Sequence, residues 1–255
     1  MHSSDFYTDL PHETYERNGK PIQYPSIFYT DYRYFQLTAL APLKNVKRLL
    51  PSEKIFPYQP FPGLGVIAIA VYEYRQTDFG PYNEIGLGVP VSYGKSLPLF
   101  TGSLRKMPTQ HYFYLHQLPL NSQYPCDLGV EMGGYPKYMA DIEFTDETGW
   151  VTCTMHVDGQ HAVTIKGRTD LPMKQMDREI THPLNFKDGR LLRSETILAP
   201  REMGFSMSQN DVELTYGDHE LGQIIQELEI KRIFQYAYCP ACCGNLTFVL
   251  ESLPG

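Results

Sequence analysis

The segment Gly129–Phe144, with the sequence GVEMGGYPKYMADIEF, places one lysine between a glycine- and proline-containing turn and an apolar run. Gly133 and Gly134 allow the backbone to bend or to approach another group closely. Pro136 fixes its own φ near about −65° and biases the residue before it toward an extended conformation. We therefore expect Lys137 to project from stiff backbone, with the rest of the chain folded around it.

Lys137 is a candidate nucleophile. Burial disfavours the charged ammonium form of a lysine, and a neutral amine can attack a carbonyl carbon to form a Schiff base. The alternative is a solvated lysine at a loop corner, because lysines are rarely buried in soluble proteins. The residues of the segment alone leave both interpretations open.

The same segment resembles the active-site motif of the acetoacetate decarboxylase family, in which a G-R-E stretch runs into a Y/F-P-K-K-L pattern. The matching residues are Gly129, Glu131, Tyr135, Pro136 and Lys137, and Met139 stands in for the leucine. Tyr138 occupies the place of the second lysine. The resemblance implies that Lys137 forms an imine with a ketone, in chemistry for which acetoacetate decarboxylase is an established example. It also implies that Glu131, Tyr135 and Tyr138 contact the substrate.

A second match lies at residues 79–93, FGPYNEIGLGVPVSY, which is similar to the Y-x-E-x-G…I/V-P-V pattern of the family. The matching residues are Tyr82, Glu84, Gly86, Val89, Pro90 and Val91. The resemblance places Glu84 in the cavity beside the lysine and Tyr82 at the substrate. A carboxylate beside an amine can hold the reacting group or carry protons. The alternative is an acid on the rim of a hairpin.

Two further polar positions of the family pattern differ. Tyr32 stands where the resemblance places an arginine for the substrate carboxylate, and tyrosine can only form a weaker, neutral hydrogen bond there. Arg33 is offset by one residue, so it lies on the opposite face of its strand and is expected to face solvent. Glu73 is the candidate for a second cavity acid, although an acid facing water is the preferred interpretation. These differences, together with the abundance of tyrosine, phenylalanine and methionine, favour a substrate that is larger or less charged than acetoacetate.

The resemblance implies an α+β fold, a mostly antiparallel β-barrel-like domain of the acetoacetate decarboxylase type with few short helices, and the composition agrees with it. The chain of 255 residues has 19 tyrosines, 13 phenylalanines, 20 glycines and 20 prolines, which suits many short strands joined by turns. We expect residues 1–27 to form an extended N-terminal arm and residues 28–255 a single barrel domain. Strands are predicted at residues 32–40, 65–74, 110–120, 150–156, 162–167, 191–198, 202–207, 212–216 and 230–251, and a further strand follows the Gly80-Pro81 turn within residues 79–93. A short helix is predicted at residues 43–50, and Asp158-Gly159 is predicted as a hairpin turn.

The strand at residues 110–120 contributes a further candidate. Its side chains alternate, and one set is expected to face the cavity, with Phe113 as a substrate contact. His111 and His116 lie on opposite faces, so at most one reaches the site, and structural roles are preferred for both.

Several functional classes are excluded or disfavoured. A net charge of −7 without a basic run argues against nucleic acid as a partner. No apolar stretch is long enough to span a membrane, and the N-terminus lacks the apolar core of a signal peptide, so a cytoplasmic location is expected. Cys239, Cys242 and Cys243 lack a second pair of zinc ligands and are expected to pack in the core. Motifs for nucleotide, metal or other cofactors are missing, so no cofactor is expected.

Taken together, the residues and the resemblance predict a Schiff-base-forming lyase that acts on a small-molecule keto or carbonyl substrate through Lys137. The reaction is either decarboxylase-like or an aldol condensation with dehydration, in specialised metabolism. The resemblance also implies a homo-oligomer. Two alternatives stay open: a cyclase or isomerase whose cavity guides the substrate without a covalent intermediate, and a non-catalytic binding barrel.

Overall fold

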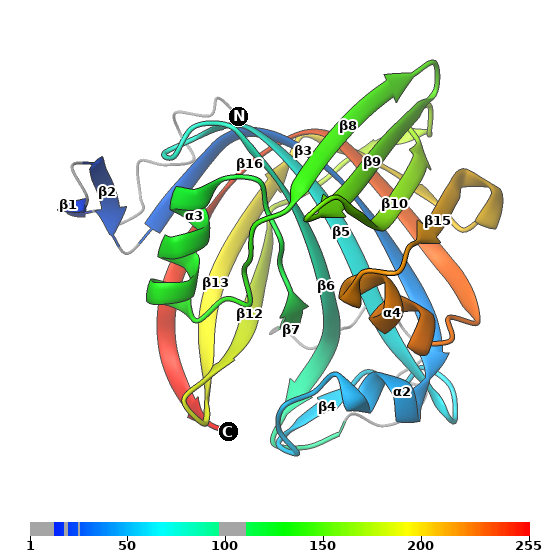
Figure 1. The fold of residues 1–255 in the computed structure, drawn as a ribbon, viewed down its shortest axis with the longest axis horizontal. Coiled ribbons are helices and arrows are strands. Elements are labelled where there is room, and N and C mark those ends of the chain that lie inside the picture. The colour runs from blue at the N-terminus through cyan, green and yellow to red at the C-terminus, as the bar shows by residue number, and fades with distance from the viewer. Residues whose placement is uncertain (1–12, 18–19, 25, 97–110) are drawn as a thin grey trace.

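The computed structural model describes residues 13–17, 20–24, 26–96 and 111–255, and these residues form a barrel with a smaller sheet packed beside it (Figure 1). The barrel wall consists of seven strands: β3 (Ser26–Pro42), β5 (Leu64–Thr77), β6 (Tyr82–Tyr93), β7 (His111–Gln117), β12 (Glu179–Lys187), β13 (Arg190–Pro200) and β16 (Arg232–Pro254). It closes because β16 pairs with both β13 and β3. Neighbouring strands are antiparallel except for the parallel pair β7 and β12. The predicted fold class is confirmed.

The remaining strands extend the barrel or form the second sheet. The second sheet has the order β15 (Val212–Tyr216), β10 (Gln160–Arg168), β9 (Trp150–Val157) and β8 (Asp141–Glu147). The short strands are β4 (Ile55–Pro57), β11 (Met173–Gln175) and β14 (Glu202–Ser206), and β1 (Glu13–Arg17) pairs with β2 (Lys20–Tyr24). The described residues thus show a hairpin within the expected N-terminal arm, whose residues 1–12 lie outside the described part of the chain.

The helices are short, as expected. They are α2 (Leu43–Arg48), α3 (Gln123–Leu128), α4 (Glu220–Glu227), a π-helix at Gly129–Gly133 and a 3₁₀ turn at Gln209–Asp211. The sequence predicted α2 but not α3, α4 or the strands β8 and β12. No helix in the described ranges is long and apolar enough to span a membrane.

Most predicted strands are confirmed, with bounds that extend beyond the predicted ones. The hairpin between β9 and β10 turns at Asp158 and Gly159, both of which have a positive φ. β16 runs through the Cys239–Cys243 segment, where its pairing with β3 shifts register. The five cysteines are free thiols, and Cys239 and Cys242 are buried, in agreement with the expected packing role.

Alternating side chains of β3, β5 and β6 belong to two separate apolar clusters. Phe35 and Leu37 of β3 pack in the larger cluster, which includes Val151 and Val163 of the second sheet. The alternate residues of these strands are rich in tyrosine and form the smaller cluster with α3 and the end of β16. The strand period of two therefore separates a structural core from the tyrosine-rich face, and Lys137 lies on the latter.

The prediction that Arg33 faces solvent is wrong. Arg33 does point away from Tyr32, but the second sheet covers that face of β3, and Arg33 is only 8% exposed. Its guanidinium donates two hydrogen bonds to Asp146 of β8, at 2.6 and 2.9 Å, and its Nε lies 2.7 Å from Glu73. Such bidentate, charge-assisted contacts fix the position of both partners. Arg33 thus joins the barrel to the second sheet.

The Arg33–Asp146 pair predicts a specific dependence of stability on pH. The hydrogen bonds from Arg33 lower the pKa of the Asp146 carboxyl below its ordinary value. A carboxyl group with a lowered folded-state pKa stabilises the fold above its unfolded pKa of about 3.9, and this contribution is lost as the pH falls through the folded-state value. We expect Asp146→Asn to lower the free energy of unfolding at pH 6, and the difference from the wild type to shrink as the pH falls below about 4. Urea unfolding across this pH range measures the difference.

Glu213→Gln is the matched control for that measurement, because Glu213 is an exposed acid on the second sheet. It should show a smaller difference from the wild type at pH 6. A difference for Asp146→Asn that stays constant down to pH 3 would contradict the assigned pairing.

Candidate active site

The backbone that carries Lys137 is fastened to β6 through a short intervening segment. Leu118 donates its N–H to the Pro136 carbonyl at 3.0 Å, and Leu120 donates to the Tyr138 carbonyl at 3.1 Å. On its other side, Leu120 forms an isolated bridge with Glu84 of β6. Lys137 lies between the two bonded carbonyls, so this ladder places its side chain next to that of Glu84.

Two glycines shape the approach to the lysine. Gly134 adopts a left-handed conformation with φ of 61°, which ends the π-helix and turns the chain toward Tyr135. Gly129 packs directly against the lysine side chain: a Cβ atom at Gly129 would lie 2.7 Å from both Cδ and Cε of Lys137. The glycine therefore makes room for the extended lysine.

Gly129→Ala is a test of lysine placement. Gly129 has an ordinary helical φ of −62°, so an alanine is compatible with the backbone, and the flexible lysine side chain is the group that must shift. A misplacement of about 1 Å can lower a rate by roughly 10²-fold. We expect the kcat of a reaction that uses the Lys137 amine to fall by about 10- to 100-fold. The thermal unfolding midpoint should change little.

The neighbouring Val130→Ala, at a half-exposed position, is the matched control and should leave kcat near the wild-type value. An unchanged kcat in Gly129→Ala would show that the close contact with Lys137 is not needed.

Lys137 and Glu84 form a buried ion pair. The Lys137 Nζ atom lies 2.5 Å from Oε2 of Glu84, and each side chain is 6% exposed. The second carboxylate oxygen accepts a hydrogen bond of 3.4 Å from the Tyr74 hydroxyl. The lysine Nζ also lies 5.8 Å from the ring centre of Tyr135 and 5.9 Å from that of Tyr82. The amine is thus held by one carboxylate and two aromatic rings.

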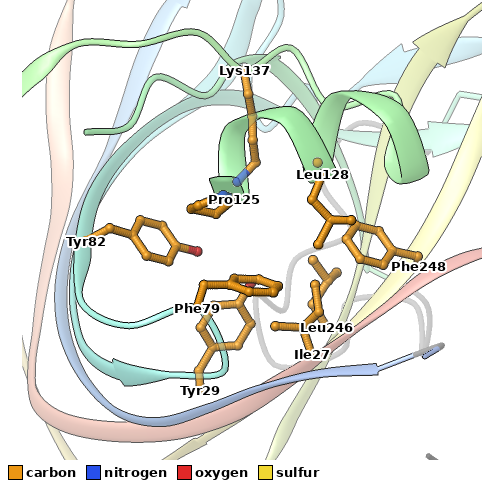
Figure 2. A pocket seen from close by; sticks show the side chains of 10 residues that line it. Ile27, Tyr29, Phe79, Tyr82, Pro125, Leu128, Lys137, Leu246 and Phe248 are labelled. Atoms are coloured by element: carbon orange, nitrogen blue, oxygen red, sulfur yellow. The ribbon is translucent and has the colours of Figure 1, made fainter. Parts of the chain in front are cut away.

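A cavity of about 210 Å³, including its opening to solvent, lies at the end of the lysine side chain. Figure 2 shows Lys137, Tyr29 and Tyr82 directed into this space from different elements of the fold. Most of the other lining side chains are apolar: Ile27, Phe79, Pro125, Leu128, Leu246 and Phe248. The chemistry available is therefore that of one amine and its carboxylate partner, with tyrosine hydroxyls, in an otherwise apolar enclosure.

The tyrosines around Glu84 are held in their neutral form. Burial, followed by the negative charge of Glu84, raises the pKa of the Tyr74 hydroxyl well above its ordinary value. The same two causes raise the pKa of Tyr29, whose hydroxyl is hydrogen-bonded to that of Tyr82. Neutral hydroxyls can donate hydrogen bonds to a carbonyl oxygen, and they contribute no charge.

The structure brings four of the predicted site residues together: Lys137, Glu84, Tyr82 and Tyr135. Tyr32 is buried in the same cluster but does not line the cavity, and its hydroxyl accepts a hydrogen bond of 3.0 Å from the Cys242 thiol. It therefore lies in the layer behind the cavity wall.

Three other predicted contacts lie away from the cavity. Tyr138 points away from Lys137, and its hydroxyl donates to Gln117 at 2.8 Å. Glu131 is exposed on the π-helix. The ring of Phe113 covers Gly88 of the neighbouring strand β6. None of the three lines the cavity.

The remaining candidates have structural surroundings. His116 lies near α2, with Nδ1 3.2 Å from the Leu49 carbonyl oxygen, and burial lowers its pKa. The side chain of His111 lies outside the described residues. Glu73 is 26% exposed on its side chain and pairs with Arg33, on the face of the sheet away from Lys137.

Sequence reasoning missed most of the apolar lining. Ile27 and Tyr29 come from the start of β3, which precedes the strand predicted at residues 32–40. Pro125 and Leu128 lie on α3, which was not predicted. A helical spacing of apolar residues between Tyr124 and Leu128 is the one local signal that precedes the lysine segment. No group of three or more histidine, cysteine or acidic side chains in the described part of the chain could hold a metal ion.

Comparison with known families gives one match over most of the chain. The sequence model of the acetoacetate decarboxylase family matches residues 13–243. No curated protein sequence matches the chain.

Several solved structures share the fold. Acetoacetate decarboxylase from Legionella pneumophila superposes with a TM-score of 0.67 at 17% identity, over 99% of this chain and 96% of that chain. MppR, an enduracididine biosynthesis enzyme, has a TM-score of 0.64 at 13% identity, over 90% of this chain and 87% of that one. An acetoacetate decarboxylase-like enzyme from Sphingomonas wittichii has a TM-score of 0.52 at 11% identity, over 89% and 94% of the two chains.

Proposed function

Because the chain belongs to the acetoacetate decarboxylase family, we propose that it is a lyase that forms a Schiff base between Lys137 and a carbonyl substrate. The observation that carries this proposal is the buried pair of Lys137 and Glu84, at 2.5 Å, at the edge of an enclosed cavity. Most lysines are solvated surface groups, so a buried lysine that is paired with a carboxylate is a candidate for a catalytic role.

The pair explains how the amine becomes a nucleophile. Transfer of one proton from the ammonium to the Glu84 carboxylate leaves a neutral amine and a neutral acid, with no change in the net charge of the site. The amine then attacks the carbonyl carbon, and the resulting carbinolamine loses water to give the protonated imine. The acid beside it can supply the proton that the departing hydroxyl group needs.

The protonated imine supplies the electron sink for the next step. It withdraws electrons from an adjacent C–C or C–H bond, which breaks to give an enamine. Reprotonation of the enamine, or its addition to a second carbonyl compound, completes a decarboxylase-like or an aldol-type reaction. MppR, with a similar fold, was solved with pyruvate and with the condensation product of pyruvate and imidazole 4-carboxaldehyde. That likeness in fold supports aldol-type chemistry as one of the two.

The cavity volume of about 210 Å³ includes open solvent, so it sets no limit on the size of the substrate. The expectation of a substrate that is larger or less charged than acetoacetate stays a prediction. Four other expectations stay predictions: a small-molecule partner, a cytoplasmic location, a role in specialised metabolism and a homo-oligomeric state.

Exchange of acetone protons for deuterium tests the imine and enamine steps together. The protonated imine of acetone loses an α-proton to a base in the site, and the enamine regains a deuteron from heavy water. We expect proton NMR to show exchange that depends on the protein and competes with other small ketones. Exchange no faster than in buffer would contradict the proposal. Binding of ketones without exchange would instead favour a non-catalytic barrel.

A further inference from the structure

The charges around the cavity balance without a substrate. Among the described residues that line it, Lys137 is the only one with a charged side chain, and Glu84 is its partner. Arg33 and Arg75 adjoin tyrosines of the cluster in sequence, and both pair with acids: Arg33 with Asp146 and Glu73, and Arg75 with Asp31 and Glu73. The positive charge of a protonated imine is therefore already matched by one carboxylate, and the described lining residues offer no second cation to a carboxylate on the substrate.

Along with burial, the negative charge of Glu84 already raises the pKa values of the surrounding tyrosine hydroxyls. Besides Tyr74 and Tyr29, the pKa values of Tyr72, Tyr82 and Tyr135 are raised, by burial first and also by the charge of Glu84. A second negative charge placed in the same cavity would meet the same burial and the same repulsion. The tyrosine hydroxyls stay neutral, so they can donate hydrogen bonds to an anion but supply no positive charge to balance it.

We propose that the substrate taken by Lys137 is a neutral aldehyde or ketone, not a keto acid. This inference rests on the proposed Schiff-base function and names its substrate class. With no carboxylate on the substrate, the bond that breaks in the protonated imine is an α C–H bond or the C–C bond of an aldol. In the first case the α-proton passes to a base such as the Glu84 carboxylate, and its electron pair forms the enamine double bond. In the second case that pair comes from the C–C bond, and the leaving fragment departs as a carbonyl compound after its hydroxyl loses a proton.

Pyruvamide and pyruvate form a matched pair of probes, because they share one shape and differ by one negative charge. Each is incubated with the protein and sodium cyanoborohydride, which reduces the imine to a stable amine. Intact-mass spectrometry then gives the concentration for half-maximal labelling, corrected for the reactivity of each probe with Nα-acetyl-lysine. We expect pyruvamide to label at a concentration at least tenfold lower than pyruvate.

A substitution at the cavity wall tests the cause of this preference. Phe79 lines the cavity, is partly exposed and packs on Tyr124, so a long polar side chain can be accommodated there. Phe79→Arg supplies the missing cation and should bring pyruvate labelling to within about threefold of pyruvamide labelling. Phe79→Met, the matched neutral variant, should keep the preference for pyruvamide.

The outcomes separate the two proposals. Labelling of Lys137 by pyruvate at a concentration equal to or lower than that for pyruvamide would overturn the neutral-substrate inference and leave the Schiff-base function standing. Absence of Lys137 labelling by either probe would overturn both. Equal responses of Phe79→Arg and Phe79→Met would show that charge in the cavity does not set the preference.

Discussion

Replacing Lys137 with alanine is expected to lower the protein-dependent exchange of acetone protons by roughly 10³-fold or more. The reason is that no other amine lines the cavity among the described residues, so the imine cannot form elsewhere in the site. Proton NMR in heavy water measures the rate. Lys231→Ala is the matched control: Lys231 is exposed, and among the described residues it pairs with Glu229 at the surface, so its loss should leave the rate unchanged.

The same substitution has an expected effect on folding that must be separated from catalysis. Removing Lys137 leaves the Glu84 carboxylate buried without its cation, and breaking a buried pair in this way typically costs about 3–5 kcal/mol. The double variant Lys137→Met with Glu84→Gln removes both charges and should recover most of that stability. A folded double variant that still exchanges acetone protons at the wild-type rate would contradict the assignment of Lys137.

Replacing Glu84 with glutamine is expected to lower kcat by about 10²–10⁴-fold, which is the usual contribution of a positioned acid or base. The amide keeps the shape of the side chain and can still contact Lys137, but it cannot accept the ammonium proton or return it. The imine should still form, more slowly, so prolonged reduction with borohydride should label Lys137 in this variant. The measurements are the steady-state exchange rate and the time course of labelling.

Tyr74→Phe is the control for Glu84. It removes a hydroxyl that lies 3.4 Å from the other carboxylate oxygen and does not touch the amine. Its effect should be much smaller than that of Glu84→Gln. If the two variants are equally impaired, the role of Glu84 is to pack and hydrogen-bond within the tyrosine cluster, and proton transfer belongs to another group.

The pairing of Lys137 with Glu84 could be anticipated because both lie in short motifs that resemble active-site motifs of the family. A lysine after Tyr-Pro and a glutamate within Tyr-x-Glu-x-Gly pointed to one cavity, although 53 residues separate them. The strands could be anticipated for a related reason, since alternation and turn residues such as Asp158 and Gly159 are local signals. The two motifs are joined by backbone hydrogen bonds from Leu118 and Leu120 to the lysine segment. These contacts are not local, so no sequence pattern predicts them.

The failures share a physical cause. Arg33 was expected to face solvent because strand alternation gives only the face of a residue, while whether that face is covered depends on β8, a distant strand that carries Asp146. Tyr138 was expected at the substrate because it occupies the place of the second lysine in the family motif, and Phe113 because one face of its strand was expected to line the cavity. Their direction is set instead by Gln117 and by Gly88, through tertiary packing. The apolar wall contributed by α3 could not be anticipated while the helix itself was unrecognised.

The most direct test of the account is to find which residue carries the reduced imine. The protein is treated with acetone and sodium borohydride, digested, and its peptides are sequenced by tandem mass spectrometry. A Schiff base at Lys137 predicts a mass increase equal to acetone less one oxygen atom, on Lys137 and at no other lysine to a comparable extent. An unmodified Lys137, with the label absent or spread over surface lysines, would contradict it.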